Sequence, residues 1–126
     1  MIDHISIGVR DIARTQKFYD AVMQPLGFKR TSTDDASLGY GRDGTMASFW
    51  ALKSDKPVPA DSGSGLHVCF AAPDQASVDA FYRAAVAAGG KDNGKPGIRK
   101  EYSGQYYAAF VVDPDGYRIE AYHGRT

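Results

Sequence analysis

The chain has 126 residues, of which 43% are hydrophobic and 24% charged, a composition typical of a soluble globular protein with one buried core. Fifteen basic residues balance fifteen acidic ones without long runs of either sign, which argues against a nucleic-acid partner or a membrane surface. Cys69 is the only cysteine, so no internal disulfide can form, and no segment approaches the roughly 18 apolar residues of a membrane span. Since the N-terminus is too short and polar for a signal-peptide core, we expect a cytoplasmic protein.

The sequence repeats itself at an offset of 63, so that residues 4–27 lie over residues 67–90 without a gap. Seven of the aligned pairs are identical, where chance would give about one or two. The identical pairs are His4/His67, Asp11/Asp74, Ala13/Ala76, Phe18/Phe81, Tyr19/Tyr82, Ala21/Ala84 and Gly27/Gly90. This internal duplication predicts two structurally equivalent modules.

In chain order, each copy opens with a strand and continues into a helix. The alternation of Ile5, Ile7 and Val9 is typical of a strand with one buried face. Asp11 is a suitable N-cap for a helix that ends near residues 25–27, at a proline and a glycine. The second copy repeats the pattern with alternation at Val68, Phe70 and Ala72, an N-cap at Asp74 and a stop at Gly89-Gly90.

Shorter strands are expected after each helix. In the first copy they are expected at residues 28–31, 37–41 and 45–53. In the second copy residues 91–100 form a weak, glycine- and lysine-rich stretch, and clearer strands are expected at 106–112 and 117–123. Residues 54–64 have the composition of a linker. The predicted fold is therefore α+β, with two βαβββ modules at about residues 1–53 and 65–123 in a single domain covering residues 1–126.

The strand alternation also predicts which side chains face away from the helices. If the apolar alternate positions pack under the helix, His4 and Ser6 lie on the opposite face, and the duplication places His67 and Cys69 there too. The same argument applied to the last strand turns Glu120 to that face. A glutamate on a covered face is costly unless it is paired or binds a cation. Two histidines and a carboxylate are also the ligand set of open divalent-metal sites.

Simpler interpretations exist for each of these residues. A lone histidine at the start of a strand is more often structural than a ligand. Glu120 alone would most often be a solvated edge residue, and Cys69 a small apolar filler. The duplication and the shared face favour the metal site.

Three motifs resemble those of the vicinal-oxygen-chelate superfamily, which groups glyoxalases, bleomycin-resistance proteins and extradiol dioxygenases. They are M-I-D-H-I-S-I-G-V-R-D at the start, G-L-H-V-C-F after the linker and D-P-D-G-Y-R-I-E-A-Y near the end. The resemblance covers essentially the whole chain and implies a cup-shaped mixed sheet with helices on its outer face. It also implies that one divalent metal ion (Fe²⁺, Mn²⁺, Zn²⁺ or Ni²⁺) binds His4, His67 and Glu120, with Glu120 as the catalytic residue.

Two functions of different classes follow from the resemblance. The first is a metal-dependent enzyme that chelates the oxygens of a small substrate, with dioxygenase-like or glyoxalase-related lyase or transferase chemistry. The second is a metal-free small-molecule binding protein of the bleomycin-resistance type. The residues expected to line the pocket are Ser6, Ser48, Trp50, Cys69, Tyr102 and Phe110.

The resemblance further implies a homodimer, because relatives commonly pair the first module of one chain with the second module of another. His4 would then serve a site whose other ligands come from the second subunit. A standard glyoxalase I takes a fourth ligand, a glutamate, from the last strand of its first module. Aligning Asp43-Gly44 with Asp115-Gly116 places Ser48 opposite Glu120, and no carboxylate occurs at residues 45–52. We therefore expect this protein not to be a standard glyoxalase I.

Overall fold

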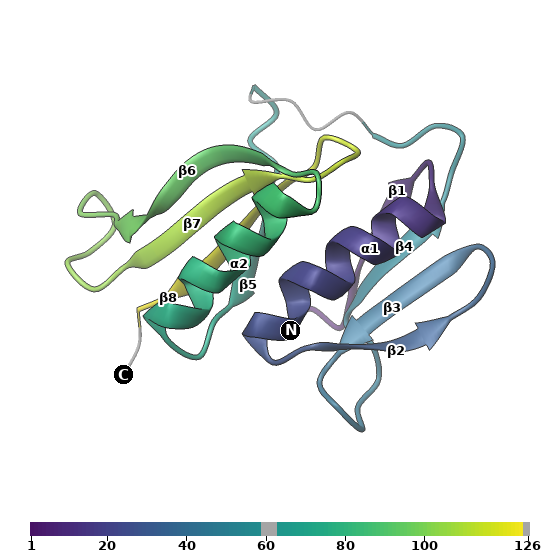
Figure 1. Cartoon of the computed structure of the whole chain (residues 1–126), viewed down its shortest axis with the longest axis horizontal. Helices are drawn as coiled ribbons and strands as arrows, with labels where there is room; N and C mark the ends of the chain where they lie inside the picture. Colours follow the sequence, from purple (N-terminus) through teal and green to yellow (C-terminus); the bar gives the residue numbers. More distant parts are fainter. Residues whose placement is uncertain (59–62, 125–126) are drawn as a thin grey trace.

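The computed structural model of the chain describes residues 1–58 and 63–124, and shows the same βαβββ arrangement twice (Figure 1). The first module comprises β1 (Ile5–Val9), α1 (Ile12–Met23), the 3₁₀ turn η1 (Gln24–Leu26), β2 (Lys29–Thr33), β3 (Ser37–Gly41) and β4 (Phe49–Lys53). The second comprises β5 (Val68–Ala71), α2 (Gln75–Ala87), β6 (Lys91–Ile98), β7 (Tyr107–Val112) and β8 (Arg118–His123). The two predicted modules are confirmed, while the predicted linker lies partly outside the described residues.

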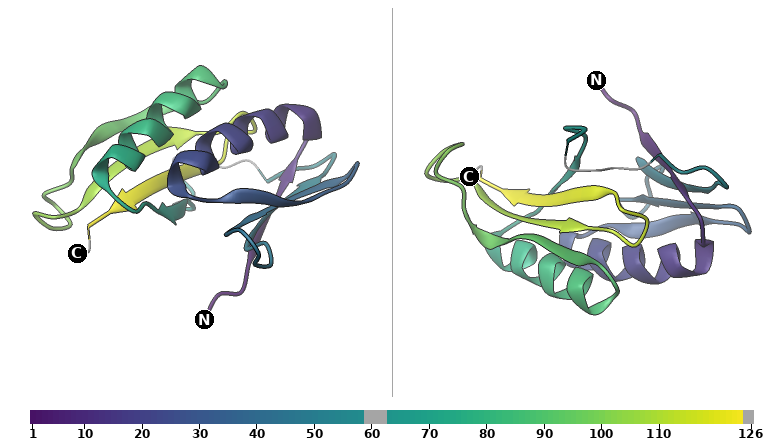
Figure 2. Two further views of the ribbon diagram at one scale, coloured as in Figure 1. Left: turned by 60° about the horizontal axis from the view of Figure 1, so that its bottom comes forward. Right: turned by 90° about the horizontal axis from the view of Figure 1, so that it is seen from above.

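Each module folds into one four-stranded mixed sheet. The strand orders are β1-β4-β3-β2 and β5-β8-β7-β6, and in each sheet the first pair is parallel and the others antiparallel. Over residues 1–58 and 63–124 no strand pairing joins the two sheets, so one chain contains two open sheets. Both helices lie side by side on the same side of the sheets (Figure 2). The opposite side of each sheet is called its open face below.

Both helices begin at the predicted aspartates. The side chain of Asp11 accepts a hydrogen bond from the backbone N–H of Arg14 at 3.1 Å, and that of Asp74 accepts one from Ser77 at 2.7 Å. Gly27 ends the turn that follows α1 in a left-handed conformation, with φ of 84°. These local signals therefore set the helix boundaries as the sequence predicts.

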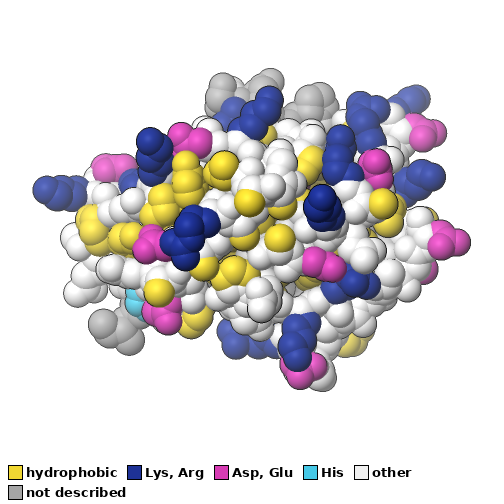
Figure 3. All heavy atoms as spheres, viewed as in Figure 1, with side chains coloured by type: hydrophobic (Ala, Val, Ile, Leu, Met, Phe, Trp, Pro, Cys, Tyr) yellow, Lys and Arg dark blue, Asp and Glu magenta, His cyan; other side chains and the backbone are white. Residues whose placement is uncertain are grey.

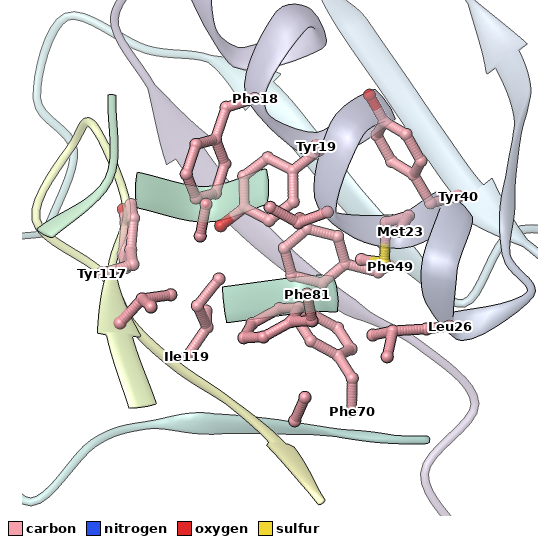
Figure 4. Packing of buried hydrophobic residues seen from close by; sticks show 14 of the residues in the cluster. Phe18, Tyr19, Met23, Leu26, Tyr40, Phe49, Phe70, Phe81, Tyr117 and Ile119 are labelled. Carbon is pink, nitrogen blue, oxygen red and sulfur yellow. The ribbon is translucent and has the colours of Figure 1, made fainter. Parts of the chain in front are cut away.

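One hydrophobic core is shared by the two modules (Figure 4). The duplicated Phe18 and Phe81 are both 0% exposed. Tyr19 packs against Phe49 at 5.1 Å between ring centroids, and Phe49 packs edge-on against Phe70 of the second module at 5.2 Å. This aromatic chain fixes how the modules sit relative to each other.

The turn before β8 is anchored on the first module. The buried carboxylate of Asp113 accepts a hydrogen bond from the Tyr19 hydroxyl at 2.5 Å and two more from the backbone N–H groups of Asp115 and Tyr117. Burial raises the pKa of Asp113, and burial together with the Asp113 charge raises the pKa of Tyr19 well above its ordinary value. Arg14 donates to Asp115 at 3.0 Å. Because β8 starts directly after this turn, its side chains are held in a fixed direction.

Strand boundaries differ from the sequence prediction in two informative places. The strand expected at residues 45–53 is confined to Phe49–Lys53, because Thr45 turns back and bonds the carbonyl of Arg42 through both its N–H and its hydroxyl. The stretch that appeared weak, residues 91–100, contains the regular strand β6. Its register shifts around Gly94 and before Gly97, and such bulges explain why no simple alternation is visible there.

Charges of both signs are interspersed over the face seen in Figure 3, as the balanced composition predicts. Within the described part of the chain no helix is long and apolar enough to cross a membrane.

Candidate functional site

Glu120 is a buried carboxylate on the open face of the second sheet. The residue is only 1% exposed. Strand register places it beside Cys69 of β5 on one side and Phe110 of β7 on the other. Its chain neighbours Ile119 and Ala121 belong to the hydrophobic core on the helix side. Glu120 therefore lies on the face that strand alternation predicts.

Two side chains hold the Glu120 carboxylate. His67 Nε2 lies 2.9 Å from Oε1, and the hydroxyl of Tyr106 donates to Oε2 at 2.6 Å. The glutamate side chain is 2% exposed and the imidazole 47%, so this pair connects the buried carboxylate to the surface of the open face. Such partners offset the cost of burying a carboxylate. Burial and the hydrogen bond to Glu120 raise the pKa of Tyr106, so its phenol remains a proton donor at neutral pH.

Cys69 lies next to this pair but is poorly suited to act as a nucleophile. Partial burial of the thiol and the neighbouring Glu120 charge raise the pKa of Cys69 to about 12. A thiol with such a pKa stays protonated near neutral pH, whereas reactive cysteines have lowered values. The role of a small pocket-lining residue therefore fits better.

An aromatic wall borders the carboxylate. Tyr106 stacks on Tyr122 with 4.1 Å between ring centroids, and Tyr102 packs on Tyr106 at 4.8 Å. Tyr106 was not among the residues expected from the sequence to line the pocket, and nothing in the sequence connected it with Glu120. Its spacing of four residues from Phe110 places both on one face of the strand expected at residues 106–112, and this signal was present in the sequence. In the structure Tyr106 lies immediately before β7. The hydrogen bond itself depends on the register between β7 and β8.

His4 lies apart from the other two predicted metal ligands. Its side chain is 52% exposed and pairs with Asp3, 2.6 Å away. The segment that carries it projects away from the body of the molecule (Figure 2). Over residues 1–58 and 63–124 no three histidine, cysteine, aspartate or glutamate side chains are close enough to hold a metal ion together. One chain thus brings together His67 and Glu120 and leaves His4 outside the site that they form.

The position equivalent to Glu120 in the first module is Trp50, which corrects the sequence alignment that chose Ser48. Ser6 pairs with Trp50 in the first sheet, as its equivalent Cys69 pairs with Glu120 in the second. The shift arises because seven residues separate β3 from β4, whereas five separate β7 from β8. The indole lies across β3, where a Cβ at Gly39 would come within 2.8 Å of its ring.

The predicted substrate-binding residues do not share one cavity within a single chain. His67, Tyr102 and Phe110 line a cavity of about 210 Å³ on the open face of the second sheet. Ser48 and Cys69 line another of about 160 Å³ between the modules, and Ser6 lines a third of about 220 Å³. Trp50 instead covers the first sheet at Gly39. The cavity beside His67 and Glu120 is therefore the candidate site.

Comparison with known proteins assigns the family. The model of the Glyoxalase/Bleomycin resistance protein/Dioxygenase superfamily matches residues 1–121. The chain belongs to this superfamily. A solved glyoxalase/bleomycin resistance protein from Albidiferax ferrireducens T118 is 31% identical, with a TM-score of 0.82 over 96% of this chain and 97% of that one. The comparison with curated protein sequences gives no match.

More distant structures of the superfamily share the fold. A family enzyme from Burkholderia phytofirmans PsJN is 19% identical, with a TM-score of 0.72 over 98% of both chains. The fosfomycin resistance protein FosX from Listeria monocytogenes is 16% identical, with a TM-score of 0.71 over 99% of this chain and 93% of that one. Members of the superfamily commonly use a divalent metal ion. A neighbouring imidazole and carboxylate, as in His67 and Glu120, suit such an ion.

Proposed function

We propose that this superfamily member is a metal-dependent enzyme acting on a small oxygenated molecule. One divalent ion (Fe²⁺, Mn²⁺, Zn²⁺ or Ni²⁺) would be held by His67 and Glu120 of one subunit and His4 of a second. The observation that carries the proposal is the buried carboxylate of Glu120, fixed beside an imidazole 2.9 Å away on an open sheet face. Glu120, at the reacting centre, is the proposed catalytic residue.

The donor set supports this assignment. Histidine nitrogen and carboxylate oxygen are the ligands of open sites for these metals, including the arrangement of two histidines and one carboxylate. Tyr106 holds Oε2 of Glu120 and leaves Oε1 on the side of His67. Hydrogen bonds of this kind to a ligating carboxylate orient it and raise metal affinity. Among the described residues of a single chain, no third ligand lies beside this pair.

A homodimer would supply that ligand. His4 precedes β1 on a segment that projects from the molecule, and its imidazole is half exposed. Each sheet has an open face, so a second copy related by a two-fold axis would place equivalent surfaces against each other. Exposed apolar side chains near the two histidines, Ile2 at 69% and Leu66 at 51%, are suited to such a contact.

The residues of the chain then have distinct tasks. When bound, the ion supplies Lewis-acid polarisation of a substrate carbonyl or hydroxyl. Tyr106 keeps Glu120 in place and retains its own proton, because its pKa is raised. The rings of Tyr102 and Phe110 line the cavity and limit water around the substrate. Trp50, in place of a carboxylate that would be the fourth ligand, favours dioxygenase-like, lyase or transferase chemistry over that of a standard glyoxalase I.

A second candidate is a metal-free binding protein of the bleomycin-resistance type. The specific observation in its favour is that both Glu120 oxygens already have hydrogen-bond partners in one chain. In that case the pair would be a structural element of a binding cavity. Metal analysis separates the two candidates.

The test is elemental analysis of the untagged protein purified without chelator. We expect about one metal ion per chain, because a two-fold dimer would have two equivalent sites. Glu120→Ala should lower metal affinity by at least about a hundredfold, because it removes one of the three protein ligands. Glu101→Ala, which removes the other glutamate of the chain at an exposed position, is the matched control and should retain the metal. A metal-free natural protein, or a Glu120→Ala variant with full metal content, would contradict the proposal.

The chemistry is tested with the methylglyoxal–glutathione hemithioacetal, supplied with Zn²⁺, Ni²⁺ or Mn²⁺. We expect no efficient conversion, because the first module offers Trp50 where a standard glyoxalase I has a carboxylate ligand. Efficient conversion that is lost in Glu120→Gln would show that the protein is a glyoxalase I after all.

A further inference from the structure

Arg118 lies next to the candidate metal ligands, and no hydrogen bond or ion pair joins its guanidinium group to another described residue. It lies two residues before Glu120 on β8, so its side chain is on the same open face. Its Nε is buried and makes no hydrogen bond, and none of the ion pairs in the described part of the chain involves it. Leaving a buried charged donor unsatisfied is costly. A ligand that accepts from this group would remove that cost.

The surroundings of Arg118 are those of a site for an anion. Arg118 and His67 line the same cavity of about 210 Å³, together with Asn93, Tyr102 and Phe110. None of the described residues that line this cavity is acidic. The nearby carboxylate of Glu120 is already engaged by His67 and Tyr106. A negative charge entering the cavity therefore meets donors and no repelling lining group.

A second guanidinium lies against Phe110, one of the residues that line this cavity. Arg99 lies over the Phe110 ring at 5.3 Å and is held by the backbone carbonyls of Lys95 and Gly97. Space for it exists because β6 has glycines there: a Cβ at Gly94 would come within 3.2 Å of its Nη2. Its bonds to carbonyls position the group, and no described carboxylate forms an ion pair with it. Arg118 thus lines the cavity beside His67, and Arg99 lies against its lining ring Phe110.

We propose that Arg118, with Arg99 over the neighbouring Phe110 ring, forms an oxyanion subsite, and that the natural substrate bears a carboxylate or a phosphate-type group next to its metal-chelating oxygens. Arginine suits this role because its planar fork donates two parallel hydrogen bonds to such groups. The inference rests on the proposed function only in taking this cavity as the substrate site. Anion binding itself does not require the metal.

The test uses the full-length, metal-stripped protein titrated separately with inorganic phosphate and acetate at constant ionic strength. Binding is followed by calorimetry and by the ¹⁵N–¹H signal of the arginine Nε groups. We expect one saturable site per chain and a shift of the Arg118 Nε–H signal. Phosphate binding alone indicates a phosphate-type substrate group, acetate binding alone a carboxylate, and both outcomes support the subsite. Absence of saturable binding of either anion would overturn it.

Variants locate the site. Arg118→Gln should weaken anion binding by at least about tenfold, the loss expected for a charge-assisted hydrogen bond, and Arg99→Gln by less. Arg42→Gln is the matched control, because Arg42 also lies over a phenylalanine ring, Phe28, at 5.8 Å, but in the first module. It should bind the anion like the natural protein. A loss of anion affinity in this control equal to that in Arg118→Gln would overturn the assignment.

Two further measurements keep the result unambiguous. Arg118→Lys retains the charge and should preserve the fold, yet bind the anion more weakly because the fork is lost; unchanged affinity would contradict a role for the fork. Metal content is measured on the same protein before stripping. Metal without anion binding would refute the subsite alone, and anion binding without metal would refute only the proposed metal enzyme.

Discussion

The two modules have the same architecture but different open faces. Their cores are equivalent, with Phe18 and Phe81 both fully buried under sheets of the same strand order. At the centre of the open faces the first module has Trp50 lying over a glycine, whereas the second has Glu120 between His67 and Tyr106. Duplication therefore preserved the packing of the core and allowed the positions on the open faces to diverge. The fold repeats, while the candidate chemistry lies in the second module.

The turn before β8 is also held more firmly than the turn before the equivalent strand β4. Asp113 is 4% exposed and anchored to Tyr19 of the other module. Asp43, in the corresponding turn of the first module, has a side chain that is 81% exposed and pairs with Lys29 at 3.3 Å. An anchored turn holds β8, and hence Glu120, in a fixed direction. The module with the buried carboxylate is thus also the one with the fixed turn.

Equivalence of the cores is tested by truncating the duplicated phenylalanines. Phe18→Ala and Phe81→Ala should each lower the free energy of unfolding by about 3–5 kcal/mol, since each leaves a large cavity. Urea denaturation measures the effect, and Val86→Ala, at a residue 47% exposed on α2, should change it by less than about 0.5 kcal/mol. If one of the two substitutions lowered the free energy of unfolding and the other did not, the two cores would not be equivalent.

The difference between the open faces is tested at Tyr106. Tyr106→Phe removes the hydrogen bond to Oε2 of Glu120 and should lower metal affinity by about 10–100-fold, the usual effect of losing such a partner. Competition with a metal chelator of known affinity gives the value. Tyr102→Phe removes a hydroxyl from the adjacent ring without touching Glu120, and should leave metal affinity unchanged. Equal affinities for Tyr106→Phe and the natural protein would show that Glu120 needs no positioning.

The anchored turn predicts a smaller, pH-dependent effect. Burial raises the pKa of Asp113 above its ordinary value of 3.8, so the folded protein holds this proton more tightly than the unfolded chain. The associated stability is fully present below that ordinary value and is lost as the pH rises through the raised pKa. The stability of the natural protein relative to Asp113→Asn should therefore fall with rising pH across this range. Urea denaturation at several pH values measures it, and parallel profiles would contradict the raised pKa.

Most of the fold could be predicted from the sequence because its signals are local. The aspartate caps and the apolar alternation each depend on a few neighbouring residues. The duplication at an offset of 63 is visible when the sequence is aligned with itself. The weak stretch at residues 91–100 was harder to interpret, since bulges in β6 at Gly94 interrupt the alternation. The alternation of side chains along the last strand was also sufficient to place Glu120 on the open face.

The candidate site could be predicted only in part, because its contacts depend on register. Counting from the aspartate-glycine turns matched Ser48 with Glu120, but the longer turn of the first module moves the match to Trp50. The link between Tyr106 and Glu120 likewise requires knowing how β7 pairs with β8. The unpartnered guanidinium of Arg118 appears only once burial and hydrogen bonds are known.

The central claim, that His4 of one subunit completes the site of His67 and Glu120 on another, is tested most directly by mixed dimers. A His4→Ala chain and a Glu120→Ala chain, carrying different tags, are mixed, refolded and purified as the heterodimer, and their metal content is measured. Shared ligands leave one complete site, so we expect about one metal ion per heterodimer, while each homodimer of a variant binds none tightly. A heterodimer without metal, or a chain that remains monomeric while binding metal, would contradict the account.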